Sequence, residues 1–280
     1  MGRSLSEAAK YVLAQFECFG VEVSENSRLK FMYKAVCNND GSSRGLIRED
    51  APGFAEAREA QRDFSQLEFF FEQVGVRDDV DSLPILLRIA QDSVLPQDDQ
   101  ENSPGRDAQA EAFVFAVCNN AGMHPVLEEP DMVCQISGKR FGVAVKRIKN
   151  MSQFSRRIYE GARQVAKSKM PGVVDIEVTM AVNPENYSIV TNVDESHVRV
   201  WWEEKMRRTV DDCHTKLCNA MRRMGVRGVF LHEHCPVKLG TDYVLRSMAY
   251  GVGTSDSFVN KAEWMQLKNA FVSGLPNLAG

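Results

Sequence analysis

The segment that most constrains the fold lies at residues 128–149. Two apolar stretches, residues 132–136 and 141–148, flank a polar turn, SerGlyLysArg at 137–140, which contains a glycine. Strand-like stretches joined by a turn of this length predict a β-hairpin. Pro130–Asp131 stands just before the first strand, and Lys146 lies near the end of the second. The predicted hairpin therefore carries the Asp131 carboxylate and the Lys146 amine together.

The second strand of this hairpin has two distinct faces, because side chains alternate across a strand. One face is predicted to carry Phe141, Val143 and Val145, and the other to carry Gly142, Ala144, Lys146 and Ile148. Ala144 thus shares a face with Lys146, two residues before it.

A helix is predicted on each side of the hairpin. The first is capped by Asp107, carries Glu111 in its first turn, is apolar from 112 to 118 and ends near Gly122. The second covers 152–169, with an apolar stripe at 154, 158, 162 and 165. A further strand is predicted at 173–180. Residues 126–129, before the hairpin, are also predicted to be extended, and the order α-β-β-β-α-β predicts an α/β fold with a mixed sheet. The rest of the chain extends it with helices at 203–224 and 257–271, a strand at 226–232, and a strand or short helix at 241–250.

Residues 1–96 are predicted to form a small all-α N-terminal domain. Its first helix opens with a capping box, Ser4 to Glu7, and three more helices are expected at 24–37, 52–74 and 81–94. Residues 97–106 are polar, acidic and broken by Pro-Gly, which is typical of a linker. The α/β domain then covers 107–280. The N-terminal domain shows no catalytic constellation, and a regulatory or partner-binding role is expected for it.

Charge is distributed unevenly along the chain, whose net charge is −4. Residues 1–105 hold 11 Lys and Arg against 19 Asp and Glu, whereas residues 106–280 hold 23 against 19. Between 132 and 174 there are ten basic residues and one acid. This asymmetry indicates an acidic module beside a polyanion-facing one, although a solvated basic helix face is the simpler interpretation. The residues predicted to contact nucleic acid are Arg147, Lys149, Arg156, Arg157 and Arg163.

In order and spacing, Glu111, Pro130–Asp131, Lys146 and Gln164 make this part of the chain resemble the PD-(D/E)XK superfamily, which has the restriction-endonuclease-like fold. The resemblance covers residues 106–181. It implies a restriction-endonuclease-like αβββαβ core and a metal-dependent nuclease that cleaves DNA with Mg²⁺ or Mn²⁺.

The resemblance also implies roles for individual residues. Asp131 would be a metal ligand, Glu111 a supporting helix acid and metal ligand, and Lys146 the catalytic lysine. Gln164 and Tyr159 fall where some branches of the superfamily carry polar residues that aid the site. The catalytic set is therefore Asp131, Lys146, Glu111 and Gln164.

Ala144 departs from the pattern, because the superfamily has an acid two residues before the lysine. One interpretation is that another carboxylate takes over, and Glu129, Asp175 and Glu177 are the candidates; with Glu129, the predicted metal ligands are Asp131, Glu111 and Glu129. The other is that the domain is catalytically inactive and binds nucleic acid or a protein partner without cutting. One or two carboxylates with water and phosphate oxygens are enough for Mg²⁺, so both stay open.

Other groupings point elsewhere with less specificity. Cys213, His214 and Cys218, with residues 232–235, offer zinc-type ligands in poor spacing. Trp201–Trp202 could stack nucleobases, but core packing is the simpler interpretation. Seven scattered cysteines and the lack of a membrane-length apolar run indicate a cytoplasmic protein with no membrane partner. The expected partner is nucleic acid, DNA in particular, with a protein partner through the acidic N-terminal domain and a homodimer both left open.

Overall fold

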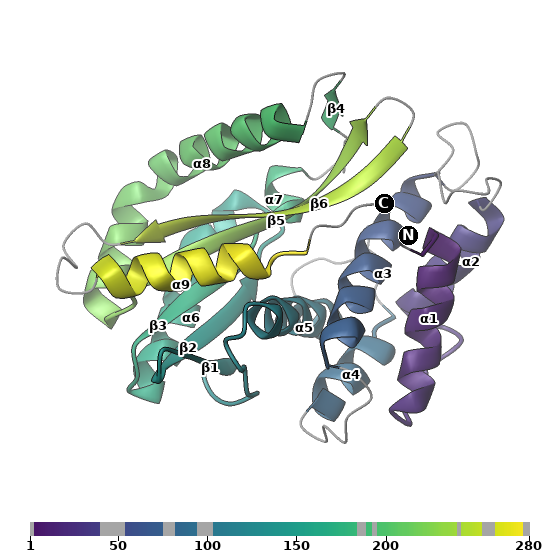
Figure 1. The fold of residues 1–280 in the computed structure, drawn as a ribbon, viewed down its shortest axis with the longest axis horizontal. Coiled ribbons are helices and arrows are strands. Elements are labelled where there is room, and N and C mark those ends of the chain that lie inside the picture. Colours follow the sequence, from purple (N-terminus) through teal and green to yellow (C-terminus); the bar gives the residue numbers. More distant parts are fainter. Residues whose placement is uncertain are drawn as a thin grey trace.

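The computed structural model describes residues 3–39, 54–74, 82–93, 103–183, 189–191, 195–239, 242–253 and 261–276. Within these residues a mixed, six-stranded sheet is covered by helices on both faces, and a group of helices from the N-terminal part packs at one side (Figure 1). The α/β class predicted from the sequence is confirmed.

The sheet has the order β1-β2-β3-β5-β4, with β6 on the other edge of β5. Its strands are β1 (Met132–Ile136), β2 (Lys139–Arg147), β3 (Gly172–Glu177), β4 (Ile189–Thr191), β5 (Gly228–Leu239) and β6 (Asp242–Gly253). Strands β2, β3, β5 and β4 run parallel, and β1 and β6 are antiparallel to their neighbours.

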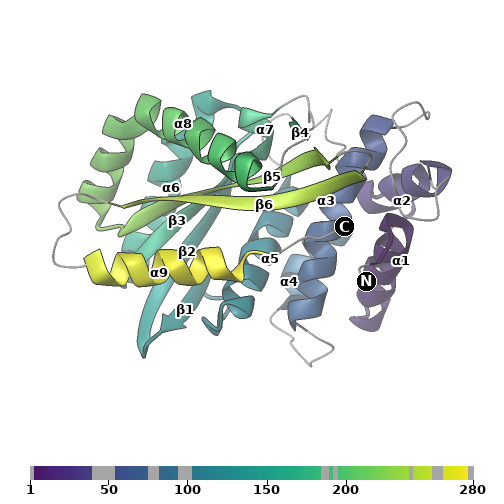
Figure 2. The same cartoon turned by 45° about the horizontal axis from the view of Figure 1, so that its top comes forward.

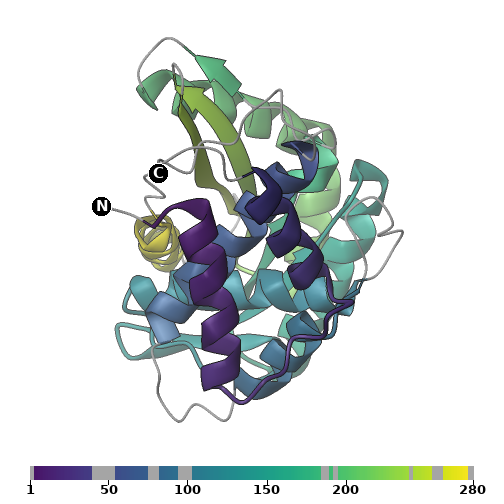
Figure 3. The same ribbon diagram turned by 90° about the vertical axis from the view of Figure 1, so that its right-hand side faces the viewer.

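Ten helical segments surround the sheet in the described part of the chain. They are α1 (Leu5–Cys18), α2 (Arg28–Asn39), α3 (Phe54–Val74), α4 (Leu83–Ala90), α5 (Pro104–Asn120), the 3₁₀ turn η2 (Met151–Gln153), α6 (Phe154–Ser168), α7 (Thr179–Val182), α8 (Glu195–Met224) and α9 (Lys261–Gly274). Helix α8 lies on one side of the β5–β6 pair and α9 on the other (Figure 2). Helices α1 to α4 stack beyond α5, with α1 and α2 outermost (Figure 3). No helix in the described ranges is both long and apolar enough to cross a bilayer.

Two apolar clusters fill the space on the two faces of the sheet. The first joins the sheet to α5, α9 and helices α1 to α4, and it includes Val143 and Val145 of β2. The second joins the sheet to α6 and α8, and it includes Ala144 and Ile148. The predicted alternation of side chains along β2 is therefore confirmed.

The αβββαβ expectation is met only in part, because two full strands, not three, separate α5 from α6 in the described residues. The expected first strand is reduced to one antiparallel bridge between Val126 and Val133. Pro125 and Pro130 flank this segment, and proline cannot donate a ladder hydrogen bond. Beyond the core, residues 241–250 are part of strand β6, which makes a long hairpin with β5.

Helix α5 starts earlier than predicted. Ser103, not Asp107, is its N-cap: the Ser103 side chain accepts a hydrogen bond from the Arg106 amide, and Pro104 takes the first helical position. Residues 103–106 of the predicted linker thus form the cap and first turn of a helix, while residues 94–102 lie outside the described ranges.

A buried polar network ties the N-terminal helices to α5. Arg28 is fully buried, pairs with Asp63, and donates to Asp92 (3.2 Å) and to Gln109 of α5 (2.7 Å). The first apolar cluster also spans both parts of the chain. The division at 97–106 remains a prediction from the sequence, but the two parts are joined by a shared core in this structure.

Candidate functional site

Three of the predicted site residues meet at the end of the β1–β2 hairpin. The Lys146 amine lies 3.0 Å from Asp131 Oδ2, and the Val145 backbone amide donates to the same oxygen at 2.7 Å. From α6, Gln164 Nε2 lies 3.3 Å from Asp131 Oδ1 and 3.3 Å from the Pro130 carbonyl oxygen. Strand register explains the meeting: Met132 pairs with Val143, which places the residue before β1 beside the end of β2.

The Asp131–Lys146 pair is largely shielded from water, with side chains 14% and 12% exposed. Burial raises the pKa of the Asp131 carboxyl, while the Lys146 ammonium and the Val145 amide lower it, and Glu129 adds to the rise. The net pKa is above its ordinary value. The pair is therefore a partly buried charge pair with each carboxylate oxygen engaged by a donor.

Glu111 stands near this pair but is bonded elsewhere. Its Oε2 is 2.6 Å from a guanidinium nitrogen of Arg88, in α4. Burial raises the pKa of the Glu111 carboxyl, and Arg88 lowers it. Asp131 also raises this pKa and Lys146 lowers it, so Glu111, Asp131 and Lys146 share one electrostatic environment.

Arg88 is a site neighbour that sequence reasoning missed. Its side chain is 42% exposed, so the cation faces solvent beside Glu111. Its position depends on close packing of α4 against α5 at Gly105, where an added Cβ would lie 2.7 Å from the Arg88 carbonyl oxygen. No local pattern in the sequence connects positions 88 and 111, so only the helix packing reveals the pair.

Ala144 is sealed beneath α6. It is fully buried, and a Cβ added at Gly161 of α6 would lie 3.5 Å from the Ala144 Cβ and 2.7 Å from Val174 Cγ1. The helix lies close on β2 and β3 at this point because position 161 has no side chain. A carboxylate at position 144 would therefore enter a packed apolar layer instead of a solvated site.

The proposed substitutes on β3 lie on the wrong face of the sheet. Asp175 is in register with Val145, on the α5 side, and its Oδ1 is 2.6 Å from His232 Nδ1. Burial raises the pKa of Asp175; burial lowers that of His232, but Asp175 outweighs it and the His232 pKa is raised. Glu177 shares this face and interacts electrostatically with Arg62 of α3. The interpretation that Asp175 or Glu177 replaces the missing acid beside Lys146 is therefore wrong.

Only one of the predicted ligands for a Mg²⁺ or Mn²⁺ ion lies at the Lys146 amine. Of the three predicted metal ligands, only Asp131 contacts Lys146, and both of its oxygens already accept hydrogen bonds from the protein. Glu111 is bonded to Arg88, and Glu129 is exposed. Across the ranges that the structure describes, no three His, Cys, Asp or Glu side chains are grouped so that they could hold a metal ion.

The residues predicted to contact nucleic acid divide into buried and exposed groups. Arg147 is only 6% exposed and donates to Asp107 of α5 at 3.3 Å, so its predicted surface contact is wrong. Arg157 also contacts α5: its side chain is 15% exposed, and its guanidinium lies 3.7 Å from the Asp107 carboxylate. Lys149 is half-buried. Arg156 and Arg163 are exposed on α6, together with Lys167 and the following Lys169.

The zinc-type groupings do not assemble either. His232 and His234 lie on the α5 side of β5, in contact with Phe113, whereas Glu233 points to α8 and accepts hydrogen bonds from Trp202 and Lys205. The exposed His214 has a ring nitrogen 3.5 Å from the Cys218 sulfur. Tyr159, half-buried, packs against the second apolar cluster.

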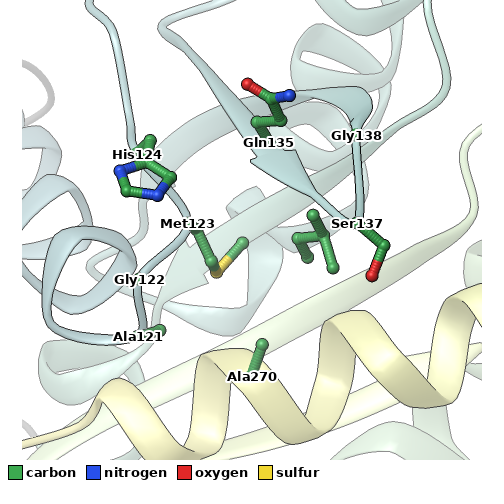
Figure 4. A pocket seen from close by; sticks show the side chains of 9 residues that line it. Ala121, Gly122, Met123, His124, Gln135, Ser137, Gly138 and Ala270 are labelled. Atoms are coloured by element: carbon green, nitrogen blue, oxygen red, sulfur yellow. The ribbon is translucent and has the colours of Figure 1, made fainter.

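A shallow cavity of about 440 Å³ lies at the opposite end of the hairpin from Asp131 (Figure 4). It is lined by residues 121–124 after α5, by residues 135–138 of the hairpin turn, and by Ala270 of α9. Gln135 and His124 are among its polar lining residues, and no predicted site residue lines it. The partly buried Asp131–Lys146 site is thus separate from this cavity.

Comparison with known proteins assigns no family to the chain: no protein-family model matches it, and no curated protein matches it. The site is therefore interpreted from its own geometry.

Proposed function

We propose that this protein binds nucleic acid through the phosphate backbone, on the surface formed by α6 beside the Asp131–Lys146 site, without cutting it through a bound metal ion. The observation that carries the proposal is that the Asp131–Lys146 ion pair lies next to a fully buried alanine, Ala144, where the superfamily has a second acid. Lys146 is matched to one carboxylate, and the position where a second would stand is filled by Ala144 under α6.

The outward face of α6 supplies the contacts. Arg156, Arg163 and Lys167 recur at spacings of seven and four residues, so they share one face of the helix, opposite the buried stripe of Phe154 and Ile158. Arginine and lysine side chains that neutralise phosphates release counterions, which supplies sequence-independent affinity. Gln164 joins this helix to Asp131, so the helix that carries the basic face also contacts the site.

The core supports a restriction-endonuclease-like fold for this part of the chain. Its elements follow the order α5-β1-β2-α6-β3, with β2 and β3 parallel, and they bring Asp131, Lys146 and Gln164 together. Metal-dependent hydrolysis is the function implied by the resemblance. It is therefore the alternative that the assays must separate from binding.

The test is fluorescence anisotropy with labelled duplex DNA, single-stranded DNA and RNA over a series of salt concentrations. We expect the affinity to fall steeply with salt, and Lys167→Gln to reduce the slope of log K against log salt by about 1. Lys10→Gln is the matched control, because Lys10 is also an exposed helical lysine but belongs to α1. No binding at low salt, or an equal loss in both variants, would refute the proposal.

A further inference from the structure

The start of helix α8 exposes an apolar pair that the fold does not cover. Val200 is 66% exposed and Trp201 is 50% exposed. Their neighbour Trp202 is only 2% exposed and donates its indole N–H to Glu233 at 2.7 Å. The structure therefore divides the tryptophan pair: one indole belongs to the core and the other faces solvent.

The exposed indole stands on a firmly anchored stretch of helix. Glu233 is fully buried, and its two oxygens lie 2.9 and 3.2 Å from the Lys205 amine. The same amine lies 5.5 Å from the centroid of the Trp201 ring, within cation–π range. Trp202 and Lys205 thus anchor the helix to β5 directly after Trp201. A ligand that binds the Trp201 side chain therefore loses little free energy to ordering of this part of the helix.

The charge of the surrounding surface selects the class of ligand. Helices α6 and α8 cover the same face of the sheet, and their sequences together hold 11 Lys and Arg against six Asp and Glu. Two exposed arginines flank the indole on α8, each paired with a glutamate of the same helix: Arg199 (70% exposed) lies 3.0 Å from Glu203, and Arg208 (75% exposed) lies 2.7 Å from Glu204. An exposed aromatic ring on a cationic face suits a ligand that presents flat rings on a polyanionic backbone.

We propose that Trp201 is a stacking platform for an unpaired nucleobase, and that the ligand of the α6–α8 face is a single-stranded nucleic acid or a single-stranded end. This inference rests on the proposed function, and it narrows the substrate class. In a duplex the faces of the bases are covered by their neighbours, whereas single-stranded bases stack on aromatic side chains with little dependence on sequence.

The test compares a labelled 15-nucleotide oligothymidylate with a duplex of the same length. We expect Trp201→Ala to weaken binding of the single strand about 5- to 150-fold, from the stacking contribution of one base, and to leave duplex affinity within about twofold. Trp201→Phe should retain most of the affinity. The matched control is Met265→Ala, which removes an exposed apolar side chain (42% exposed) from α9, on the other face of the sheet.

Intrinsic fluorescence gives a second readout. Trp202 and Trp264 are 2% and 9% exposed, so oligothymidylate should quench mainly the Trp201 emission, and the quenching should vanish in Trp201→Phe. Unchanged single-strand affinity in Trp201→Ala, or an equal loss for both probes, would overturn the inference. If Lys167→Gln still weakens binding in that case, the proposed function stands without it. If the wild type binds neither probe, both fail.

Discussion

Replacing Ala144 with aspartate would restore the acid that the PD-(D/E)XK pattern lacks, and it tests whether that position belongs to a site or to the core. Ala144 is fully buried, and a Cβ at Gly161 of the overlying helix would lie only 3.5 Å from its own Cβ. We expect Ala144→Asp to destabilise the fold without creating metal-dependent cleavage.

The expected cost has two parts. Adding side-chain atoms to a packed core costs about 1–3 kcal/mol, because neighbouring groups must move. A buried polar group without a hydrogen-bond partner costs about 1–3 kcal/mol more. The free energy of unfolding at neutral pH should therefore fall by about 2–6 kcal/mol. Burial would raise the pKa of the new carboxyl, which adds a cost of ionisation that is absent below the unfolded-state pKa of about 3.9 and grows as pH rises, whereas the two parts above remain at every pH.

Chemical denaturation at pH 7 and pH 4 measures these costs. Ala144→Leu is the matched control, because leucine has nearly the shape of aspartate without its charge. Ala144→Asp should be less stable than Ala144→Leu, and the difference should be larger at pH 7 than at pH 4. If Ala144→Asp unfolds like the wild type and gains Mg²⁺-dependent cleavage, the reasoning about a sealed position is refuted.

Three further predictions concern the packing and the buried charges. Gly161→Ala should destabilise by about 1–3 kcal/mol in thermal melts, although alanine favours helices, because its Cβ would lie 2.7 Å from Val174; a rise in stability would contradict this. Arg28→Met should cost about 3–5 kcal/mol in urea unfolding, since it removes the buried cation that pairs with both Asp63 and Asp92, whereas Arg3→Met at the surface should cost less than about 1. The raised pKa of His232 stabilises the fold below the unfolded-state value of about 6.5, and this stabilisation is lost as pH rises through the folded-state pKa; the stability difference between pH 6 and pH 9 should therefore shrink in His232→Gln, and an unchanged difference would count against it.

Local rules predicted the part of the site that lies on one hairpin. The two-residue period of a strand placed Ala144 and Lys146 on one face of β2, and the turn placed Asp131 beside the end of that strand. These relations depend on residues close in sequence. For the same reason the helix after the hairpin was predicted, and with it the position of Gln164.

The remaining features depend on packing between segments far apart in the chain. The sequence does not reveal that Arg88 of α4 reaches Glu111, because that contact depends on how α4 packs at Gly105. The charge count also missed the burial of Arg147: by strand alternation this residue shares the α5 side with Val143 and Val145, and Asp107 accepts its hydrogen bond. Charge counts along a sequence do not separate such interior cations from exposed ones.

The most direct test of the account is a plasmid-nicking assay combined with binding to the same DNA, in Mg²⁺, in Mn²⁺ and in a chelator. We predict salt-dependent binding in all three conditions, with no nicking above the level of the Lys146→Ala variant. Nicking that requires the metal ion and disappears in Lys146→Ala and Asp131→Asn would contradict the account, and it would show that the hairpin site is a working nuclease centre.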